Sequence, residues 1–390
     1  MKNAPFYLAL WVSVLPALDA ATEVRESITT DTVWSAGGSP YLVYGQIGVA
    51  PGVTLTIEPG VVVKFATREY GGEAALWVRG QLRAVGTAEA PIYFTSLNDR
   101  SVGGRTGSGN PAGGDWGGID LSPPLGDPAS VLEHCVVRYA QTGVICSRAV
   151  HVLRRCRISQ CGRGVVISER DTLAIEHCQI SQCQTGVELG ERGTLAIVNC
   201  QLEESGAAVR LGRSARVRLE QSTIRGCGDA LVWDGDATVE GGGNTVTNNS
   251  NNGVRIGGTI DWDTVWSRER LMGVGLGARY VVGPGLVAVA EMTTLTIEPG
   301  VVVEFTPWEV RSEGGGLQVR GQLRAVGTAG APIYFIPLNN QTGYWQGIFL
   351  EPPLGEPASV LEHCVVRYAG RGKLFKGGPR VAALPDQPVR

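Results

Sequence analysis

Three aspartates form the densest group of acidic side chains in the sequence. Asp229, Asp234 and Asp236 stand in the segment Gly-Asp-Ala-Leu-Val-Trp-Asp-Gly-Asp. Paired carboxylates can bind calcium, and they can also work as acid and base on a uronic acid. Asp-Gly-Asp is equally typical of a turn. The segment is therefore a candidate catalytic or calcium site, with a plain turn as the alternative.

The nine cysteines include two series that recur at a fixed interval of 22 residues: Cys156, Cys178 and Cys200 form one, and Cys161, Cys183, Ser205 and Cys227 form the other. In an exported protein, nine cysteines would ordinarily suggest disulfides with one thiol left over. A fixed period instead indicates that each cysteine occupies the same place in a repeated unit.

Several aromatic residues stand near predicted loops, where their rings could stack on sugar faces. These candidate ligand-binding residues are Tyr70, Trp77, Trp308 and Tyr344. Two further tryptophans, Trp116 and Trp345, stand in the related segments Trp-Gly-Gly-Ile and Trp-Gln-Gly-Ile, and we expect them to pack against the strands.

Apolar residues also recur every 22 positions between Arg155 and Val239. One column is Ile158, Ile180, Leu202 and Ile224, and another is Val165, Val187, Val209 and Leu231. Within each repeat, apolar and polar residues alternate, so each repeat contains short strands with one buried face. Stacking equivalent strands about 4.8 Å apart buries every column at once. The sequence therefore predicts an all-β solenoid, a parallel β-helix with coils of roughly 22 residues.

The predicted coil decides how the cysteines and histidines are interpreted. Stacked Cβ atoms about 4.8 Å apart lie beyond the usual disulfide range of about 3.5–4.5 Å, so we expect an inward ladder of free thiols. His134, His177 and His363 each precede a cysteine, which superficially suggests zinc. His134 and His177 would lie two coils apart, roughly 10 Å, which is too far to share a metal, so we expect these histidines on a solvated outer strand face.

A longer duplication overlies the coils. The segment Thr54–Val63 recurs identically at Thr294–Val303, Val78–Ala88 recurs at Val319–Ala329, and Pro128–Ala140 recurs at Pro357–Ala369. The segment 101–114, rich in glycine, is a surface loop that is much shorter in the second copy. We predict a signal peptide at 1–20, a first β-helix module at 21–262, a partial second module at 263–369 and a poorly ordered tail at 370–390.

Composition and charge limit the partners. A formal net charge of −3 gives no overall basic field, so no nucleic-acid binding is expected. Lys2 precedes an apolar run from Phe6 to Leu18, which is typical of a secretory signal peptide and is too short to span a bilayer. We expect an exported protein without a membrane span, at the cell surface, in the periplasm or secreted.

With its stacked 22-residue columns, the chain resembles the right-handed parallel β-helix proteins of the pectate-lyase-like superfamily, especially the exported bacterial β-helix repeat proteins. That resemblance implies a right-handed coil. The superfamily includes lyases, hydrolases, epimerases and adhesins. The Asn-Thr-Asp, Gly-His-Gly and Asp-Pro-His-Asp motifs of its hydrolases and epimerases do not occur in this sequence.

These observations favour an exported, non-catalytic protein that binds an extracellular or envelope polysaccharide. One alternative is a polysaccharide lyase, glycoside hydrolase or epimerase working at Asp229, Asp234 and Asp236. Another is a structural or adhesive surface protein. No cofactor is predicted, and calcium at the three aspartates is the one exception considered.

Overall fold

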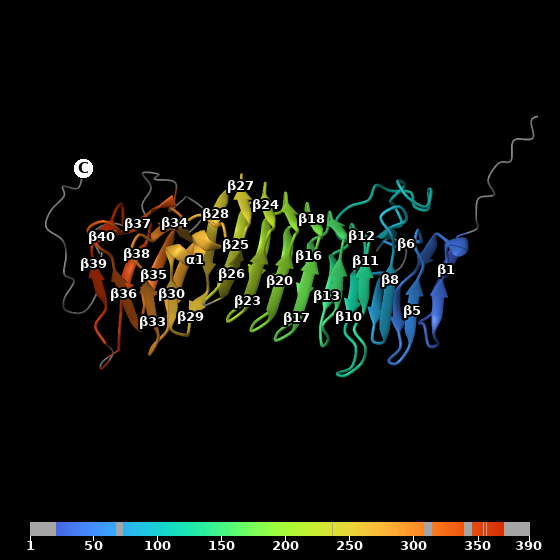
Figure 1. The fold of residues 1–390 in the computed structure, drawn as a ribbon, viewed down its shortest axis with the longest axis horizontal. Helices are drawn as coiled ribbons and strands as arrows, with labels where there is room; N and C mark the ends of the chain where they lie inside the picture. The colour runs from blue at the N-terminus through green and yellow to red at the C-terminus, as the bar shows by residue number, and fades with distance from the viewer. Residues whose placement is uncertain are drawn as a thin grey trace, which may run out of the picture.

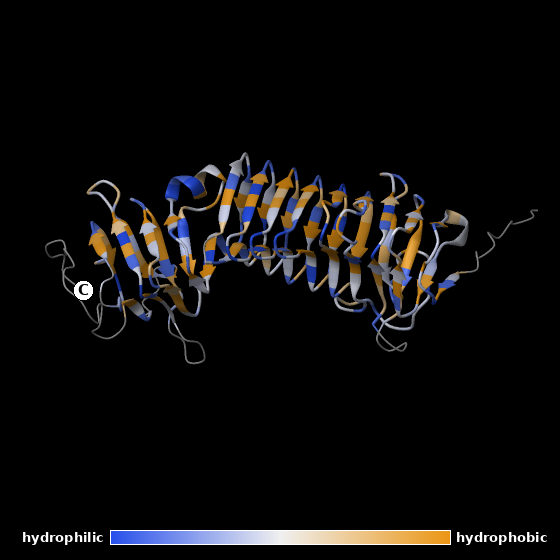
Figure 2. Cartoon of the chain, turned by 90° about the horizontal axis from the view of Figure 1, so that it is seen from below, coloured by the Kyte–Doolittle hydropathy of each residue, from blue (hydrophilic) through white to orange (hydrophobic). Residues whose placement is uncertain are grey.

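The chain coils into a long parallel β-helix whose two ends lie far apart (Figure 1). A computed structural model describes residues 21–67, 73–235, 237–307, 314–338, 345–353, 355 and 357–369. Each coil contributes one short strand to each of three stacked parallel sheets, and Figure 2 shows that the stack curves into a shallow arch. No helix among these residues is long and apolar enough to cross a bilayer.

Three sheets, A, B and C, build the first part of the solenoid, and the chain visits them in the order A, B, C. Sheet A consists of β1 (Thr22–Val24), β3 (Tyr41–Val43), β6 (Val62–Phe65), β9 (Ile92–Ser96), β12 (Cys135–Arg138), β15 (Arg157–Ser159), β18 (Gln179–Ser181), β21 (Gln201–Glu203), β24 (Thr223–Arg225) and β27 (Thr245–Thr247). Sheet C consists of β2 (Thr32–Trp34), β5 (Thr54–Ile57), β8 (Gln81–Val85), β11 (Val131–Glu133), β14 (Val152–Arg154), β17 (Thr172–Glu176), β20 (Thr194–Val198), β23 (Arg216–Glu220) and β26 (Thr238–Gly242).

Sheet B alone runs along the whole described solenoid. It consists of β4 (Gln46–Val49), β7 (Ala75–Val78), β10 (Gly118–Leu121), β13 (Thr142–Cys146), β16 (Arg163–Ile167), β19 (Thr185–Leu189), β22 (Ala207–Leu211), β25 (Asp229–Asp234), β28 (Asn251–Gly257), β31 (Arg279–Val282), β34 (Val302–Phe305), β37 (Ile333–Pro337) and β40 (Cys364–Val366). A short 3₁₀ helix, η1 (Ala36–Gly38), lies between β2 and β3.

Two shorter sheets replace A and C beyond β28. Sheet C′ follows B in chain order and consists of β29 (Thr259–Ile260), β32 (Gly285–Val289), β35 (Gly315–Val319) and β38 (Gly347–Leu350). Sheet A′ precedes B and consists of β30 (Thr264–Trp266), β33 (Thr294–Ile297), β36 (Gln322–Val326) and β39 (Val360–Glu362). The helix α1 (Arg268–Gly273) is inserted between β30 and β31 and packs against β26, the last strand of sheet C.

The predicted 22-residue columns are stacked in register inside the coil. Ile158 pairs with Ile180, Ile180 with Leu202, and Leu202 with Ile224 along sheet A. All four side chains are at most 1% exposed. The parallel β-helix predicted from the sequence is therefore confirmed.

The duplicated segments sit on different faces of the solenoid. Residues 54–57 form β5 in sheet C, but the identical residues 294–297 form β33 in sheet A′. Likewise, β6 belongs to sheet A and its equivalent β34 to sheet B. Equivalent strands differ by 28 in their numbering (33 − 5 and 34 − 6), and 28 strands make nine coils of three plus one extra strand. The second copy is therefore turned one face further around the axis.

Trp116 and Trp345 occupy equivalent interior positions in the two copies. Trp116 is fully buried and stacks on Phe65 with ring centroids 4.0 Å apart, and Trp345 stacks on Phe305 at 3.9 Å. The indole nitrogens donate to the backbone oxygens of Arg138 and Arg367, at 2.9 and 2.8 Å. These two tryptophans therefore pack inside the coil, where a ligand could not reach them.

Candidate functional site

A groove follows the line where the outer face of sheet B meets the turns that lead into sheet C. We call it the sheet-B groove. It is made of two connected hollows of about 690 and 470 Å³, which share Glu169, Glu188 and Gly190. Ser122, Ser147, Ser168, Gly190, Gly212 and Gly258 line it, each directly after a sheet-B strand.

The close stacking of the coils explains why glycines occupy several of the positions that directly follow the sheet-B strands. A Cβ atom on Gly190 would lie 2.7 Å from the backbone nitrogen of Glu169, and one on Gly212 would lie 2.8 Å from that of Glu191. Side chains are excluded there by the neighbouring coil. The result is a smooth floor bordered by longer polar residues.

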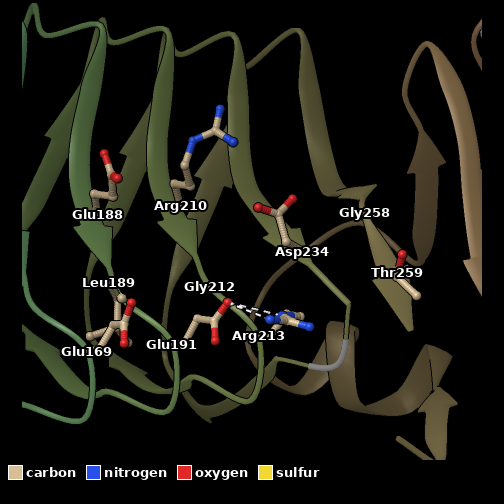
Figure 3. A pocket seen from close by; sticks show the side chains of 11 residues that line it. Glu169, Glu188, Leu189, Glu191, Arg210, Gly212, Arg213, Asp234, Gly258 and Thr259 are labelled. Atoms are coloured by element: carbon tan, nitrogen blue, oxygen red, sulfur yellow. Dashed lines mark hydrogen bonds and ion pairs between the residues drawn. The ribbon is translucent and has the colours of Figure 1, made fainter. Parts of the chain in front are cut away.

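Charged side chains project from the outer face of sheet B into the groove. Glu188 on β19 and Arg210 on β22 are direct register neighbours and point to the same side (Figure 3). Glu188 is paired at 3.8 Å with Arg163, whereas Arg210 makes no ion pair within the part of the chain that the structure describes. Arg210 is therefore a cation available to a ligand.

A second set of charges lies in the turns that border the groove. Arg213 contacts the carboxylates of Glu191 at 2.9 Å and Asp261 at 2.7 Å. The hydrogen bonds that Arg213 donates to the carboxylate of Glu191 are the main cause that raises the pKa of Arg213. Because these ion pairs are largely exposed, we assign them a positioning role rather than a large share of the stability.

Of the three aspartates singled out in the sequence, the two that the structure describes do not converge. Asp229 and Asp234 lie at opposite ends of β25, five residues apart. At about 3.3 Å per residue, their backbones are roughly 16 Å apart, too far for carboxylates that act on one bond, which lie about 5–9.5 Å apart in glycosidases. Asp236 lies outside the described residues.

Asp229 and Asp234 lie in different surroundings. Asp229 accepts from Nε of Arg255 at 2.7 Å, so it is held in an ion pair on the outer face of sheet B. Asp234 lines the sheet-B groove. Among the described residues, no group of three His, Cys, Asp or Glu side chains is placed to hold a metal ion.

Of the four aromatic candidates, the structure describes one. Trp77 on β7 is 39% exposed, and its register neighbour is Asp120, which lines the sheet-B groove. Tyr70, Trp308 and Tyr344 lie outside the described residues. Sequence reasoning overlooked Trp262, which is 57% exposed and directly follows Asp261.

The structure corrects the expectation for the histidines. His134, His177 and His363 do not stand on a strand face but at bends between strands, with φ of 50°, 54° and 48°. This left-handed conformation is uncommon for residues other than glycine, although histidine is among the enriched types. His134 and His177 therefore mark the corner between sheets C and A, and His363 marks the corner between sheets A′ and B.

The cysteines line the interior and serve as hydrogen-bond acceptors between coils. The backbone N–H of Cys156 donates to Sγ of Cys178 at 3.3 Å, and that of Cys178 to Sγ of Cys200 at 3.4 Å. The series continues from Cys200 to the hydroxyl of Ser222 at 3.0 Å. Cys161, Cys183 and Cys227 are also buried, and all nine cysteines are free thiols.

We expect the thiols of Cys146, Cys156, Cys178 and Cys200, whose pKa values are raised, to resist alkylation in the native protein. The pKa of Cys200 is raised, first by its hydrogen bond with the thiol of Cys178 and then by burial, and burial raises the pKa of Cys146. Since the thiolate is the reactive form, iodoacetamide should label these residues only in denaturant. Peptide mass spectrometry after labelling measures this.

Cys364 provides the internal comparison, because it is only partly buried and burial raises its pKa to about 11. It should be labelled before the ladder thiols. Rapid native labelling of Cys178 or Cys200 would contradict the buried ladder.

Comparison with known families agrees with the coil geometry. A family model described as a right-handed β-helix region matches residues 126–261. Searches of curated proteins and of solved structures return no match.

Proposed function

We propose that this chain, a right-handed β-helix protein, is an exported, non-catalytic protein that binds a polysaccharide along the sheet-B groove. The observation that carries this proposal is the length of the groove. It follows sheet B from the coil of β7 to that of β28, seven strand spacings of about 4.8 Å, or roughly 34 Å. A groove of that length accommodates several consecutive sugar rings.

The lining suits a ligand rich in hydroxyl groups. Glu188 and Arg210 offer acceptors and donors side by side, and Ser147 and Ser168 add hydroxyl groups. The exposed ring of Trp77, beside Asp120, supplies an apolar face on which a sugar could stack.

Calorimetric titration with a panel of neutral and acidic polysaccharides tests the proposal. For the polymer that binds, Arg210→Ala should weaken binding about tenfold or more, because a hydrogen bond to a charged group contributes about 1.5–3 kcal/mol. The matched control is Arg218→Ala, since Arg218 lies on β23 of the same coil but on sheet C.

Equal losses in the two variants, or none in Arg210→Ala, would exclude the groove as the binding site. The same incubations are assayed for new reducing ends and for unsaturated sugars. Their appearance would replace the binding function with that of a lyase or glycosidase.

A further inference from the structure

A buried charge cluster fastens the loop that follows β9 onto the outer face of sheet A. Lys64 is fully buried, and its ammonium group donates to the backbone oxygens of Asp99 at 2.8 Å and Gly104 at 2.6 Å. It also donates to the hydroxyl of Thr106 at 3.0 Å. Burial lowers the pKa of Lys64 to about 8, so the group still carries its proton at neutral pH.

Asp99 joins this lysine to Arg138. Its carboxylate is 2.6 Å from Nη2 of Arg138 and accepts hydrogen bonds from Thr95 and Ser101. Burial alone would raise the pKa of Asp99, but these hydrogen bonds and Arg138 lower it below its usual value. The aspartate is therefore an anion that holds the guanidinium in one position.

The guanidinium of Arg138 is also fixed from the sides by aromatic rings. It lies 5.7 Å from the ring centroids of both Tyr93 and Tyr139. Its Nε atom is buried and has no hydrogen-bond partner among the described residues. Arg138 is thus preorganised and retains an unused donor.

A separate hollow of about 220 Å³ lies beside this arginine, on a different face from the sheet-B groove. Its lining includes Tyr93, Arg138, Arg157, Ser159, Gln179 and Ser181. Arg138 pairs in register with Ser159, and Arg157 lies diagonally next to Arg138, within reach for long side chains. Arg157 is exposed and makes no ion pair within the described ranges.

The local charge at this hollow is opposite to that of the whole chain. Lys64, Arg138 and Arg157 are cations and Asp99 is an anion. The formal charges of these four groups sum to +2, whereas the net charge of the whole protein is −3. The carboxylate nearest along the strand column, Glu203, is already paired with Arg225 at 2.8 Å. An anion entering the hollow would therefore meet uncompensated positive charge.

The second copy of the duplicated sequence keeps only part of this set of residues. Tyr334, Arg367 and Tyr368 stand where Tyr93, Arg138 and Tyr139 stand in the first copy. Lys64, however, is replaced by Glu304, which pairs with Arg279 at 3.2 Å. The two copies thus carry buried charges of opposite sign at this strand position.

We propose that the hollow between Arg138 and Arg157 binds an oxyanion, namely a sulfate, phosphate or carboxylate group. Two guanidinium groups with adjacent serine hydroxyls match the donors that such groups require. Tyr93 forms one wall, which favours a ligand in which the oxyanion is attached to a larger body.

Titration calorimetry with inorganic sulfate, phosphate and acetate tests the site in the intact protein. Each is compared with sodium chloride at the same ionic strength, because general screening affects exposed arginines as well. We expect saturable binding of at least one oxyanion to the wild type. Arg157→Gln should weaken it about tenfold or more, whereas Arg216→Gln, an exposed arginine on sheet C, should leave it unchanged.

Arg157 is the first choice for substitution because it is exposed and its replacement leaves the loop contacts intact. Arg138→Gln should abolish binding, and the equivalent Arg367→Gln is its control. The proposal would be overturned if the oxyanion titrations did not differ from the sodium chloride titration. An oxyanion affinity that is unchanged in Arg157→Gln would also overturn it. Oxyanion binding should persist in Arg210→Ala, so this site and the sheet-B groove can fail independently.

Discussion

Replacing Trp116 with alanine is expected to lower the free energy of unfolding by about 3–5 kcal/mol. The side chain is fully buried, and its ring is stacked almost parallel to Phe65, at 5° and a centroid distance of 4.0 Å. Truncation leaves a cavity inside the coil and removes the hydrogen bond to the backbone oxygen of Arg138. Urea denaturation followed by circular dichroism measures the change.

Trp77→Ala is the matched control, because Trp77 stands one coil earlier on sheet B but faces outward at 39% exposure. Its loss should cost less than about 1 kcal/mol. Coils of a solenoid can open separately, so hydrogen exchange in β9 and β12 is followed beside the denaturation curve. A Trp116→Ala protein that unfolds at the wild-type urea concentration and keeps this protection would contradict the expectation.

Gly118→Ala should destabilise the protein by about 3 kcal/mol or more, because no side chain fits at this position. Gly118 has a φ of +120°, and a Cβ atom there would lie 1.6 Å from the backbone oxygen of Thr142 on the next coil. Relief of that clash requires β10 and β13 to separate. The midpoint of urea denaturation and hydrogen exchange in β13 report the effect.

The second copy supplies the control for this glycine. It keeps a glycine, Gly347, at φ +112°, but it has Gln346 in place of Gly117 and Gly316 in place of Ala75. A Cβ on Gly117 would lie 3.0 Å from that of Ala75, so the two changes compensate each other. The double variant Ala75→Gly, Gly117→Gln should therefore be far more stable than Gly118→Ala. Equal stability of the double variant and Gly118→Ala would show that the backbone conformation of Gly118 does not determine the stability of this coil.

The sequence was sufficient to predict the coil because its information is periodic. Ile158, Ile180 and Leu202 repeat at the interval that stacking requires, so the core could be assigned without knowledge of any long-range contact. The turn of the second copy around the axis could not be predicted in the same way. It depends on the number of strands between equivalent positions, which is 28 and so one more than a whole number of three-strand coils, and strands of two or three residues are too short to be counted from the sequence.

The candidate sites were less predictable because they depend on neighbours far apart in the chain. Lys64, Asp99 and Arg138 meet only after two coils have closed, and the sequence signals them only by the replacement of Lys64 and Asp99 by Glu304 and Asn340 in the second copy. Asp229 and Asp234 appeared clustered because they are close in sequence, but an extended strand separates them. The alternation of apolar and polar residues was enough to predict that Arg210 points outward. It did not predict that such outward residues line a groove.

The one-face offset between the copies determines what further duplication could achieve. Because matching segments point to different sides, doubling the sequence does not double the area of any one working surface. Added copies with the same offset would place their shared features along a screw thread and return to the original side only at the fourth copy. A protein that grew in this way would present repeated motifs to partners all around its circumference instead of along a single platform.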